Sequence, residues 1–284
     1  MNKDVKCKSF CGSVMSTFDL LKWIRKRHEE DRDVGTPYRR GRNDVTVVAY
    51  AFASREKMQE CVASIEFALR ETYRNCGLLN TTLVVNRMTE RLEFLKSEFG
   101  CGFRIDIDDT LIPGDIVGFS RNMIKTLPDR FDTPYILNVH PDGFPLRCGL
   151  DEFVGRWDYI GGPWNIANDD LLTKALLSRN DGSGNGGFAL RTRKICEFGA
   201  VAYKRFWKII PDCYLLYEDI FFTRFLTRWQ PGYAKSVALA PRSESLKFSV
   251  SSELMPGECL SCLPFGFHSW CALRKIQESG RSLC

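Results

Sequence analysis

The hydrophobic positions between residues 45 and 139 follow two alternating patterns. Four short runs are rich in apolar and β-branched residues, namely VTVVAYAF (45–52), TTLVV (81–85), FRIDI (103–107) and PYILNV (134–139). Such runs are typical of strands buried on both faces of a sheet. The segments between them carry apolar residues at helical spacing. This alternation predicts an α/β fold, with a doubly wound, mostly parallel central sheet flanked by helices.

The three predicted helices begin or end at residues suited to helix termini. Ser54 is a candidate N-cap for the first, the second follows Thr89 and ends at Gly100, and the third runs from Asp115 until Pro128 halts it. The residues expected to face inward are Met58, Val62, Ile65, Leu69 and Tyr73 in the first helix, and Leu92, Leu95 and Phe99 in the second.

Sheets of this kind bind ligands beyond the carboxyl ends of their strands. The first strand ends in AFASRE without a G-x-G-x-x-G, and no G-x-x-x-x-G-K-S/T occurs anywhere, which argues against a dinucleotide enzyme or a P-loop NTPase. The fourth strand runs into HPDGF and so places His140 and Asp142 at its carboxyl end. These two residues suit a divalent metal. A simple Asp-Gly turn is the alternative interpretation.

Length and charge bound the class of protein. The chain has 284 residues, 44% hydrophobic and 26% charged, which suits a soluble globular protein with one large domain or two smaller ones. The start MNKDVKCKSFCGSV lacks the apolar core of a signal peptide, and no window is apolar enough for a membrane span. We therefore expect a cytoplasmic protein without a transmembrane segment. The net charge of +5 is too mild to require nucleic acid.

The twelve cysteines do not form a clear framework. They are scattered along a chain without an export signal, so reduced thiols are the expected state. Cys259 and Cys262 form one Cys-x-x-Cys, and Cys7 and Cys11 a looser pair. A structural zinc site usually needs two compatible pairs, or cysteine with histidine. Free thiols are therefore favoured over zinc.

Residues 1–43 differ from the rest and predict an N-terminal extension and linker, followed by one domain over 44–284. A short helix is expected after Ser16, running into Arg25, Lys26 and Arg27 and then into acidic residues. One interpretation is an extension packed on the main domain. The other is a basic amphipathic segment on a membrane surface, which the acidic residues disfavour.

The second half of the chain contains several motifs rich in glycine, aromatic residues and acids. These are DYIGGPW (158–164), GNGGFALR (184–191), YEDIFFTRFL (217–226) and PFGFHSW (264–270). Glycine is costly to order, so its concentration in the second motif indicates either a turn or a backbone that something approaches closely. Glu218 and Asp219 are interpreted either as capping residues of a helix or as a general base.

Taken in order with the Asp-Gly after the fourth strand, these motifs resemble an uncharacterised family of glycosyltransferase-like proteins. Its members carry a domain of unknown function with a GT-A-like fold, and the resemblance covers about residues 45–275. Members commonly have Gln-x-Asp-Gly where this chain has HPDG, which leaves the role of His140 open.

The resemblance implies transfer of a sugar from a nucleotide-sugar donor, with UDP favoured, to a glycan or oligosaccharide acceptor. It implies Mn²⁺ or Mg²⁺ on Asp142 and His268, with His140 as a further candidate ligand. Asp219 would be the base of an inverting transfer, with Glu218 as its rival. The implied donor-binding residues are Ala51, Asp142, Gly162, Trp164, Asn185, Gly186, Gly187 and Arg191. Soluble stand-alone enzymes of this kind occur in bacteria and large DNA viruses. The alternative is a GT-A-like module that binds a sugar or nucleotide without catalysis.

Overall fold

The structure is a computed structural model that describes residues 41–77, 79–164, 182–251 and 263–282. The predicted extension over 1–43 therefore lies almost entirely outside the described residues. The same holds for the Cys7–Cys11 and Cys259–Cys262 pairs. The cysteines within the described residues are all free thiols.

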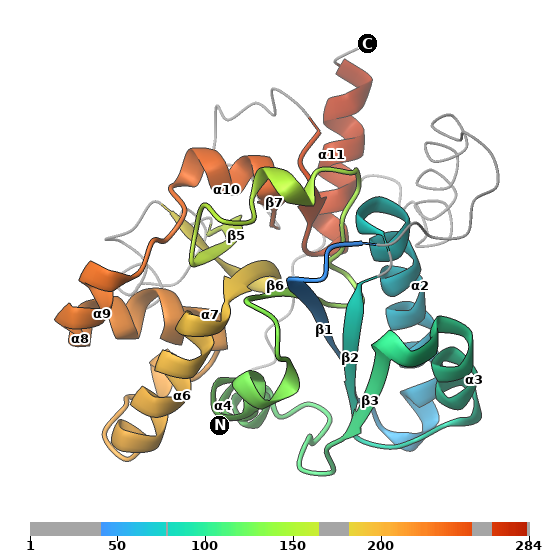
Figure 1. Ribbon diagram of the computed structural model, residues 1–284, viewed down its shortest axis with the longest axis horizontal. Helices are drawn as coiled ribbons and strands as arrows, with labels where there is room; N and C mark the ends of the chain where they lie inside the picture. Colours follow the sequence, from blue (N-terminus) through green and yellow to red (C-terminus); the bar gives the residue numbers. More distant parts are fainter. Residues whose placement is uncertain (1–40, 78, 165–181, 252–262, 283–284) are drawn as a thin grey trace, which may run out of the picture. The chain divides into compact units, whose positions relative to one another are not determined.

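A six-stranded sheet organises the described part of the chain (Figure 1). Its order is β3-β2-β1-β4-β6-β5, and the first four strands of this order are parallel. β6 runs antiparallel to β4, and β5 runs antiparallel to β6. The strands are β1 (Val45–Ala51), β2 (Asn80–Val85), β3 (Phe103–Ile107), β4 (Tyr135–Val139), β5 (Tyr159–Pro163) and β6 (Ser183–Thr192). The predicted mostly parallel, doubly wound sheet is confirmed.

β1 lies inside the sheet, between β2 and β4, and every one of its residues is buried. A strand in this position is covered on both faces by helices, so neither face needs polar side chains. The unbroken apolar run VTVVAYA is the sequence consequence of that position.

The helices that join the parallel strands follow the predicted pattern. α2 (Met58–Cys76), α3 (Glu90–Phe99) and α4 (Ile116–Thr126) occur where expected. The side chain of Thr89 caps α3 by accepting a hydrogen bond from the Leu92 N–H, and Asp115 caps α4 in the same way. Ser54 makes no such bond, and a single 3-10 turn over Arg55–Lys57 lies between it and α2. All eight residues predicted to face inward are buried.

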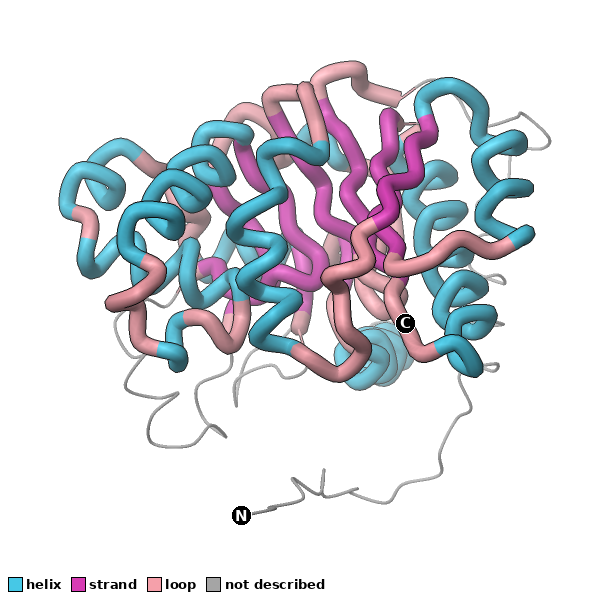
Figure 2. Tube along the Cα trace, turned by 90° about the horizontal axis from the view of Figure 1, so that it is seen from below, coloured by secondary structure: helices cyan, strands magenta, loops and turns pink. Residues whose placement is uncertain are grey.

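Helices cover both faces of the sheet, as the view in Figure 2 shows. α2 and α3 pack on each other and on β1 and β3, whereas α4 packs against α6 (Arg193–Phe206). The helix predicted to open at Glu218 is broken by a π-helical turn over Phe221–Phe225. The remaining elements are α7 (Glu218–Ile220), α8 (Leu226–Trp229), α9 (Pro231–Ser236), α10 (Arg242–Phe248), β7 (Ser249–Val250), β8 (Gly266–Phe267) and α11 (Trp270–Ser282). Among the described residues, no helix combines the length and apolarity needed to cross a bilayer.

Candidate functional site

The sheet reverses its winding direction between β1 and β4, and the candidate site lies at this point. After β1 the chain adds β2 and β3 on one side, then crosses back to place β4 on the other side of β1. Ligands of doubly wound sheets bind where the carboxyl ends of two such strands meet. β4 ends at Val139, and His140 follows it directly.

His140 and Gly143 close a tight turn at this edge. The His140 N–H donates to the Gly143 carbonyl oxygen at 3.1 Å, and the Gly143 N–H donates back at 3.0 Å. The alternative interpretation of an Asp-Gly turn is therefore correct as a description of the backbone. The turn also holds the Asp142 side chain beside two histidines, so turn and site coexist.

Three predicted metal ligands converge here. His140, Asp142 and His268 each offer a ligand atom, and these atoms all lie within 4.8 Å of one another. His268 Nε2 lies 3.5 Å from Asp142 Oδ1, and the two imidazole centroids are 5.7 Å apart. His268 follows β8, and the N–H of Ser269 donates to the Asp142 carbonyl oxygen at 2.8 Å. The predicted convergence of Asp142 and His268 is confirmed.

The ionisation of these groups suits a divalent cation. Burial, together with the charge of His268, lowers the pKa of His140 to about 4, so its imidazole is neutral near pH 7. Burial acts to raise the pKa of Asp142, but the hydrogen bond and charge of His268 outweigh it and hold this pKa below its usual range. His268 Nδ1 is buried and has no hydrogen-bond partner among the described residues. Two imidazoles and one carboxylate fit a divalent transition metal.

The glycines of β6 make room for this cluster. A Cβ atom on Gly187 would lie 2.0 Å from His268 Nε2, and one on Gly143 would lie 2.9 Å from the Gly187 carbonyl oxygen. β6 is also irregular here, because its pairing with β5 skips from Asn185 to Ala189. The His268 side chain and neighbouring backbone therefore fill the space that Gly143 and Gly187 leave, and Gly187 presents no open backbone to a sugar.

Gly186 is held on both sides by buried polar groups. Its N–H donates to Asp219 Oδ2 at 2.8 Å, and its carbonyl oxygen accepts from Asn138 Nδ2 at 2.6 Å. Asp219 Oδ1 accepts from the Ile220 N–H at 2.7 Å. Burial and the neighbouring charge of Glu218 raise the pKa of Asp219 well above its usual range. Asp219 is thus fixed in orientation and takes up a proton readily.

Arg191 requires a correction to its predicted role. Its side chain is fully buried, and Nη2 donates to Glu218 Oε1 at 2.6 Å. The guanidinium carbon lies 5.1 Å from the ring centroid of Tyr159 and 5.2 Å from that of Phe222. A side chain without exposed surface cannot touch a donor directly. Arg191 instead holds Glu218 in place.

Apart from Ala51, the other predicted donor-binding residues lie around the same end of β5 and β6. Trp164 packs over Gly184, where a Cβ would lie 1.6 Å from the indole ring, and its ring centroid is 6.4 Å from that of Tyr217. Asn185 Oδ1 accepts from the Gly187 N–H at 3.1 Å, and Gly162 lies against Ser251. Ala51 ends β1 with no exposed surface. Their contacts with a donor stay predictions.

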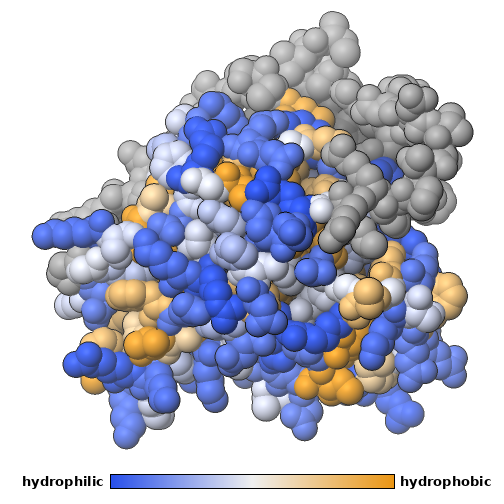
Figure 3. All heavy atoms as spheres, in the orientation of Figure 1, coloured by the Kyte–Doolittle hydropathy of each residue, from blue (hydrophilic) through white to orange (hydrophobic). Residues whose placement is uncertain are grey.

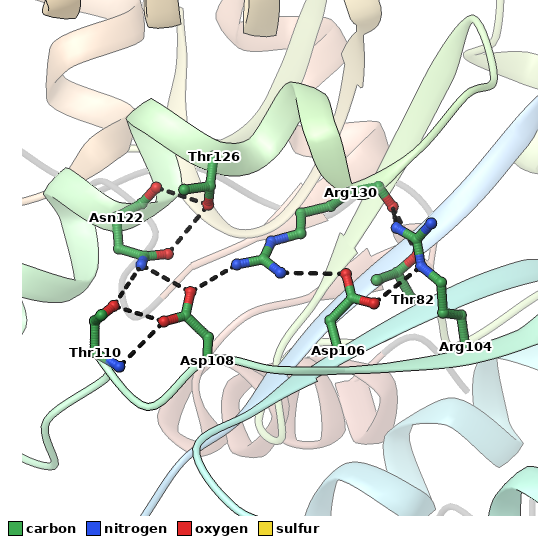
Figure 4. A network of polar contacts seen from close by, with 8 residues as sticks. All are labelled: Thr82, Arg104, Asp106, Asp108, Thr110, Asn122, Thr126 and Arg130. Carbon is green, nitrogen blue, oxygen red and sulfur yellow. Dashed lines mark hydrogen bonds and ion pairs between the residues drawn. The ribbon is translucent and has the colours of Figure 1, made fainter.

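The chain also contains a literal Asp-x-Asp at 106–108, and the structure gives it another task (Figure 4). Arg130 Nη1 lies 3.2 Å from Asp106 Oδ2, and Nη2 lies 2.6 Å from Asp108 Oδ2. Thr110 and Asn122 also donate to Asp108. Two cations of the protein, Arg130 and also Arg104 at Asp106, already offset the charge of this pair, so it suits a metal ion less well than the cluster at His140.

Two site residues were not predicted from the sequence. Asn138 is a fully buried amide within an otherwise apolar strand, and that position is the signal that could have marked it. Phe119 on α4 places its ring 6.2 Å from that of His140. Nothing in the helical pattern distinguishes it from an ordinary core residue.

Comparison with known families places this arrangement in context. Residues 114–268, more than half of the chain, match the family described as protein of unknown function DUF5672. The chain belongs to this family. The matched segment includes His140, Asp142 and His268, the three candidate metal ligands, and the Glu218–Asp219 pair. No curated protein sequence matches the chain.

Solved structures resemble the fold. An active-site mutant of LgtC, a galactosyltransferase, has a TM-score of 0.50 and 12% identity, covering 84% of this chain and 95% of LgtC. GlyE of Streptococcus pneumoniae TIGR4, a glycosyltransferase, has a TM-score of 0.45 and 13% identity. The match covers 84% of this chain and 60% of GlyE. The mannosyltransferase Ktr4p of S. cerevisiae has a TM-score of 0.40 and 12% identity. The match covers 82% of this chain and 79% of Ktr4p. The predicted GT-A-like fold is confirmed, and at this identity the likeness concerns the fold alone.

Proposed function

We propose that this protein is a glycosyltransferase that moves a sugar from a nucleotide-sugar donor to a hydroxyl of a glycan or oligosaccharide acceptor. The observation that carries the proposal is the meeting of His140, Asp142 and His268 at the switch point of a GT-A-like sheet. The fold shared with LgtC, a galactosyltransferase, supports the same class of reaction.

The cluster would hold one divalent cation, Mn²⁺ or Mg²⁺. When bound, such an ion neutralises the diphosphate of the donor and stabilises it as a leaving group. Asp142 would supply the anionic ligand, while the low pKa of His140 keeps its imidazole neutral above about pH 4, with one of its two ring nitrogens free to bind a metal. The tight turn and the missing side chains at Gly143 and Gly187 keep His268 beside Asp142.

Asp219 is our candidate for the general base of an inverting transfer. An acceptor hydroxyl is a poor nucleophile near neutral pH and needs a carboxylate within hydrogen-bond reach. The raised pKa of Asp219 makes it a stronger base than an exposed aspartate, and two backbone N–H groups fix its direction. Glu218 is less suited because it is paired with the buried Arg191.

The donor would lie along the irregular part of β6. In this proposal Asn185 offers its side-chain amide N–H groups, and Trp164 and Gly162 border the sugar. Gly186 and Gly187 shape the site rather than bind the donor, because the N–H groups of both and the carbonyl oxygen of Gly186 are already hydrogen-bonded within the protein. Ala51 has no exposed surface, so in this proposal it only closes the end of β1 beneath the donor. Arg191 acts indirectly, by positioning Glu218.

Turnover of a panel of UDP-sugars, with Mn²⁺ and with EDTA, tests the proposal. Donor hydrolysis or transfer should require the metal. Asp219→Asn should lower turnover by about 10²–10⁴-fold and leave donor affinity nearly unchanged. Normal turnover in Asp219→Asn with a collapse in Glu218→Gln would move the base to Glu218, and a retained anomeric configuration would contradict an inverting base. Binding of a UDP-sugar without any turnover would identify a non-catalytic module.

A further inference from the structure

α6 carries a surface that the candidate site does not use. One stripe of this helix, at spacings of three and four residues, lines a groove of about 710 Å³ together with Pro128. The stripe is Arg193, Glu197, Val201 and Lys204, and Trp207 continues it directly after the helix. α6 provides none of the predicted ligands, donor contacts or catalytic residues.

Three large apolar side chains are exposed within nine residues of this helix and its continuation. Val201, Trp207 and Ile209 are 68%, 53% and 75% exposed. Apolar side chains scattered singly over a surface need no explanation, but a group of them marks an interaction site. On the face drawn in Figure 3, hydrophobic residues form small groups among hydrophilic ones.

Basic residues accompany this apolar group. Lys204, Arg205 and Lys208 lie in the same turn and a half of chain, and residues 204–208 contain no acid. Lys208 Nζ lies 5.7 Å from the Trp207 ring centroid. The acids nearby are Glu197, which is paired with Arg193 at 2.6 Å, Asp212, which is paired with Arg121 at 2.9 Å, and Asp129 in the groove.

We propose that Val201, Trp207 and Ile209, with Lys204, Arg205 and Lys208, form a surface that docks on an anionic lipid bilayer. Exposed tryptophan favours the headgroup level, where its ring is buried and its N–H stays wet. Lysine and arginine extend apolar stems along a membrane surface while their charged ends reach lipid phosphates. A protein partner would have to match both features in one fixed shape, whereas a bilayer supplies them without a specific fit.

Sedimentation of the full chain with lipid vesicles tests this. One vesicle is phosphatidylcholine alone, and the other contains about 30% phosphatidylserine. We expect binding to the anionic vesicle to be at least about tenfold tighter. Trp207→Ser with Ile209→Ser should weaken it about tenfold or more. Lys204→Gln, Arg205→Gln and Lys208→Gln together should weaken it about 100-fold.

The matched control is Phe94→Ser on α3. Phe94 is 51% exposed and lies under an arginine, 4.7 Å from its ring centroid, but it belongs to another helix. This variant should bind like the wild type. Circular dichroism checks folding, and Val201→Ser replaces the double variant if that one does not fold.

Three results would overturn the proposal. Equal binding to both vesicles, or no binding to either, contradicts an anionic bilayer as the partner. Unchanged binding in the α6 variants contradicts the surface. Loss of binding only on Arg25→Gln, Lys26→Gln and Arg27→Gln would assign the membrane contact to the N-terminal segment instead.

Discussion

Burial beside His268 lowers the pKa of His140 from 6.5 to about 4, and this has a consequence for stability. The unfolded chain takes up a proton on this histidine at a higher pH than the folded chain does. Keeping this imidazole neutral therefore costs the folded protein nothing above about pH 6.5. Below that pH the free energy of unfolding decreases, and it continues to fall until the pH has dropped through about 4. In EDTA, the wild type should lose about 1–3 kcal/mol relative to His140→Gln between pH 7 and pH 4.

Urea unfolding of both proteins across this pH range measures that difference. His140→Gln lacks the titrating group, so the free energy of unfolding of the wild type should fall relative to that of this variant as the pH is lowered. Parallel curves for the two proteins would show that burial does not depress the pKa of His140.

Arg130 is the second residue whose removal should matter. It lies between Asp106 and Asp108, and its loss leaves two partly buried carboxylates without their shared cation (Figure 4). Arg130→Met should lower the free energy of unfolding by about 1–3 kcal/mol. Arg104 is the matched control, because its contact with Asp106 at 3.1 Å is more exposed and should contribute at most about 1 kcal/mol. Equal losses in chemical denaturation would contradict a special role for Arg130.

At the scale of elements, β6 joins the parts of the site. Three glycines of β6 leave room for side chains from three other segments. Trp164 packs at Gly184, the Glu218–Asp219 pair at Gly186 and His268 at Gly187. Gly187→Ala should displace His268, because its Cβ would lie 2.0 Å from Nε2. We expect Mn²⁺ affinity to fall at least about tenfold, within the range seen when groups supporting a metal ligand are lost.

Gly102→Ala is the control for this effect. An added Cβ there meets the side chain of Asn80 at 3.1 Å, which can move, and the position lies just before β3 rather than at the site. Calorimetric titration with Mn²⁺ should separate the two variants. The same affinity in Gly187→Ala and the wild type would mean that His268 does not bind the ion.

The elements also show how far sequence reasoning reaches. Apolar runs and helix termini located β1 to β4 and α2 to α4, because burial on both faces and capping leave local patterns. The π-helical turn over Phe221–Phe225 and the antiparallel direction of β6 leave no such local pattern in the sequence. These features depend on packing between distant segments. A sequence pattern shows that Gly186 and Gly187 lack side chains, but it does not show which neighbours occupy the space.

At the scale of the whole molecule, one part of the site could be predicted from the sequence and another part could not. His140, Asp142 and His268 could be predicted to meet because the chain has three histidines and the family resemblance places the last of them. The buried position of Arg191 could not be predicted, since an arginine at the end of a strand motif is usually exposed. Its burial follows from the ring pair Tyr159 and Phe222 and from Glu218, which the fold alone brings together.

Metal-dependent binding of UDP tests the central claim most directly. Thermal unfolding of the wild type is followed with UDP and Mn²⁺, with UDP and EDTA, and again in Asp142→Asn. At 100 times its dissociation constant the nucleotide should add about 2.7 kcal/mol of stability, and only when Mn²⁺ is present. Asp142→Asn should abolish this gain, because it removes the anionic ligand of the cluster. An equal gain in EDTA, or in Asp142→Asn, would contradict a metal-assisted donor site at His140, Asp142 and His268.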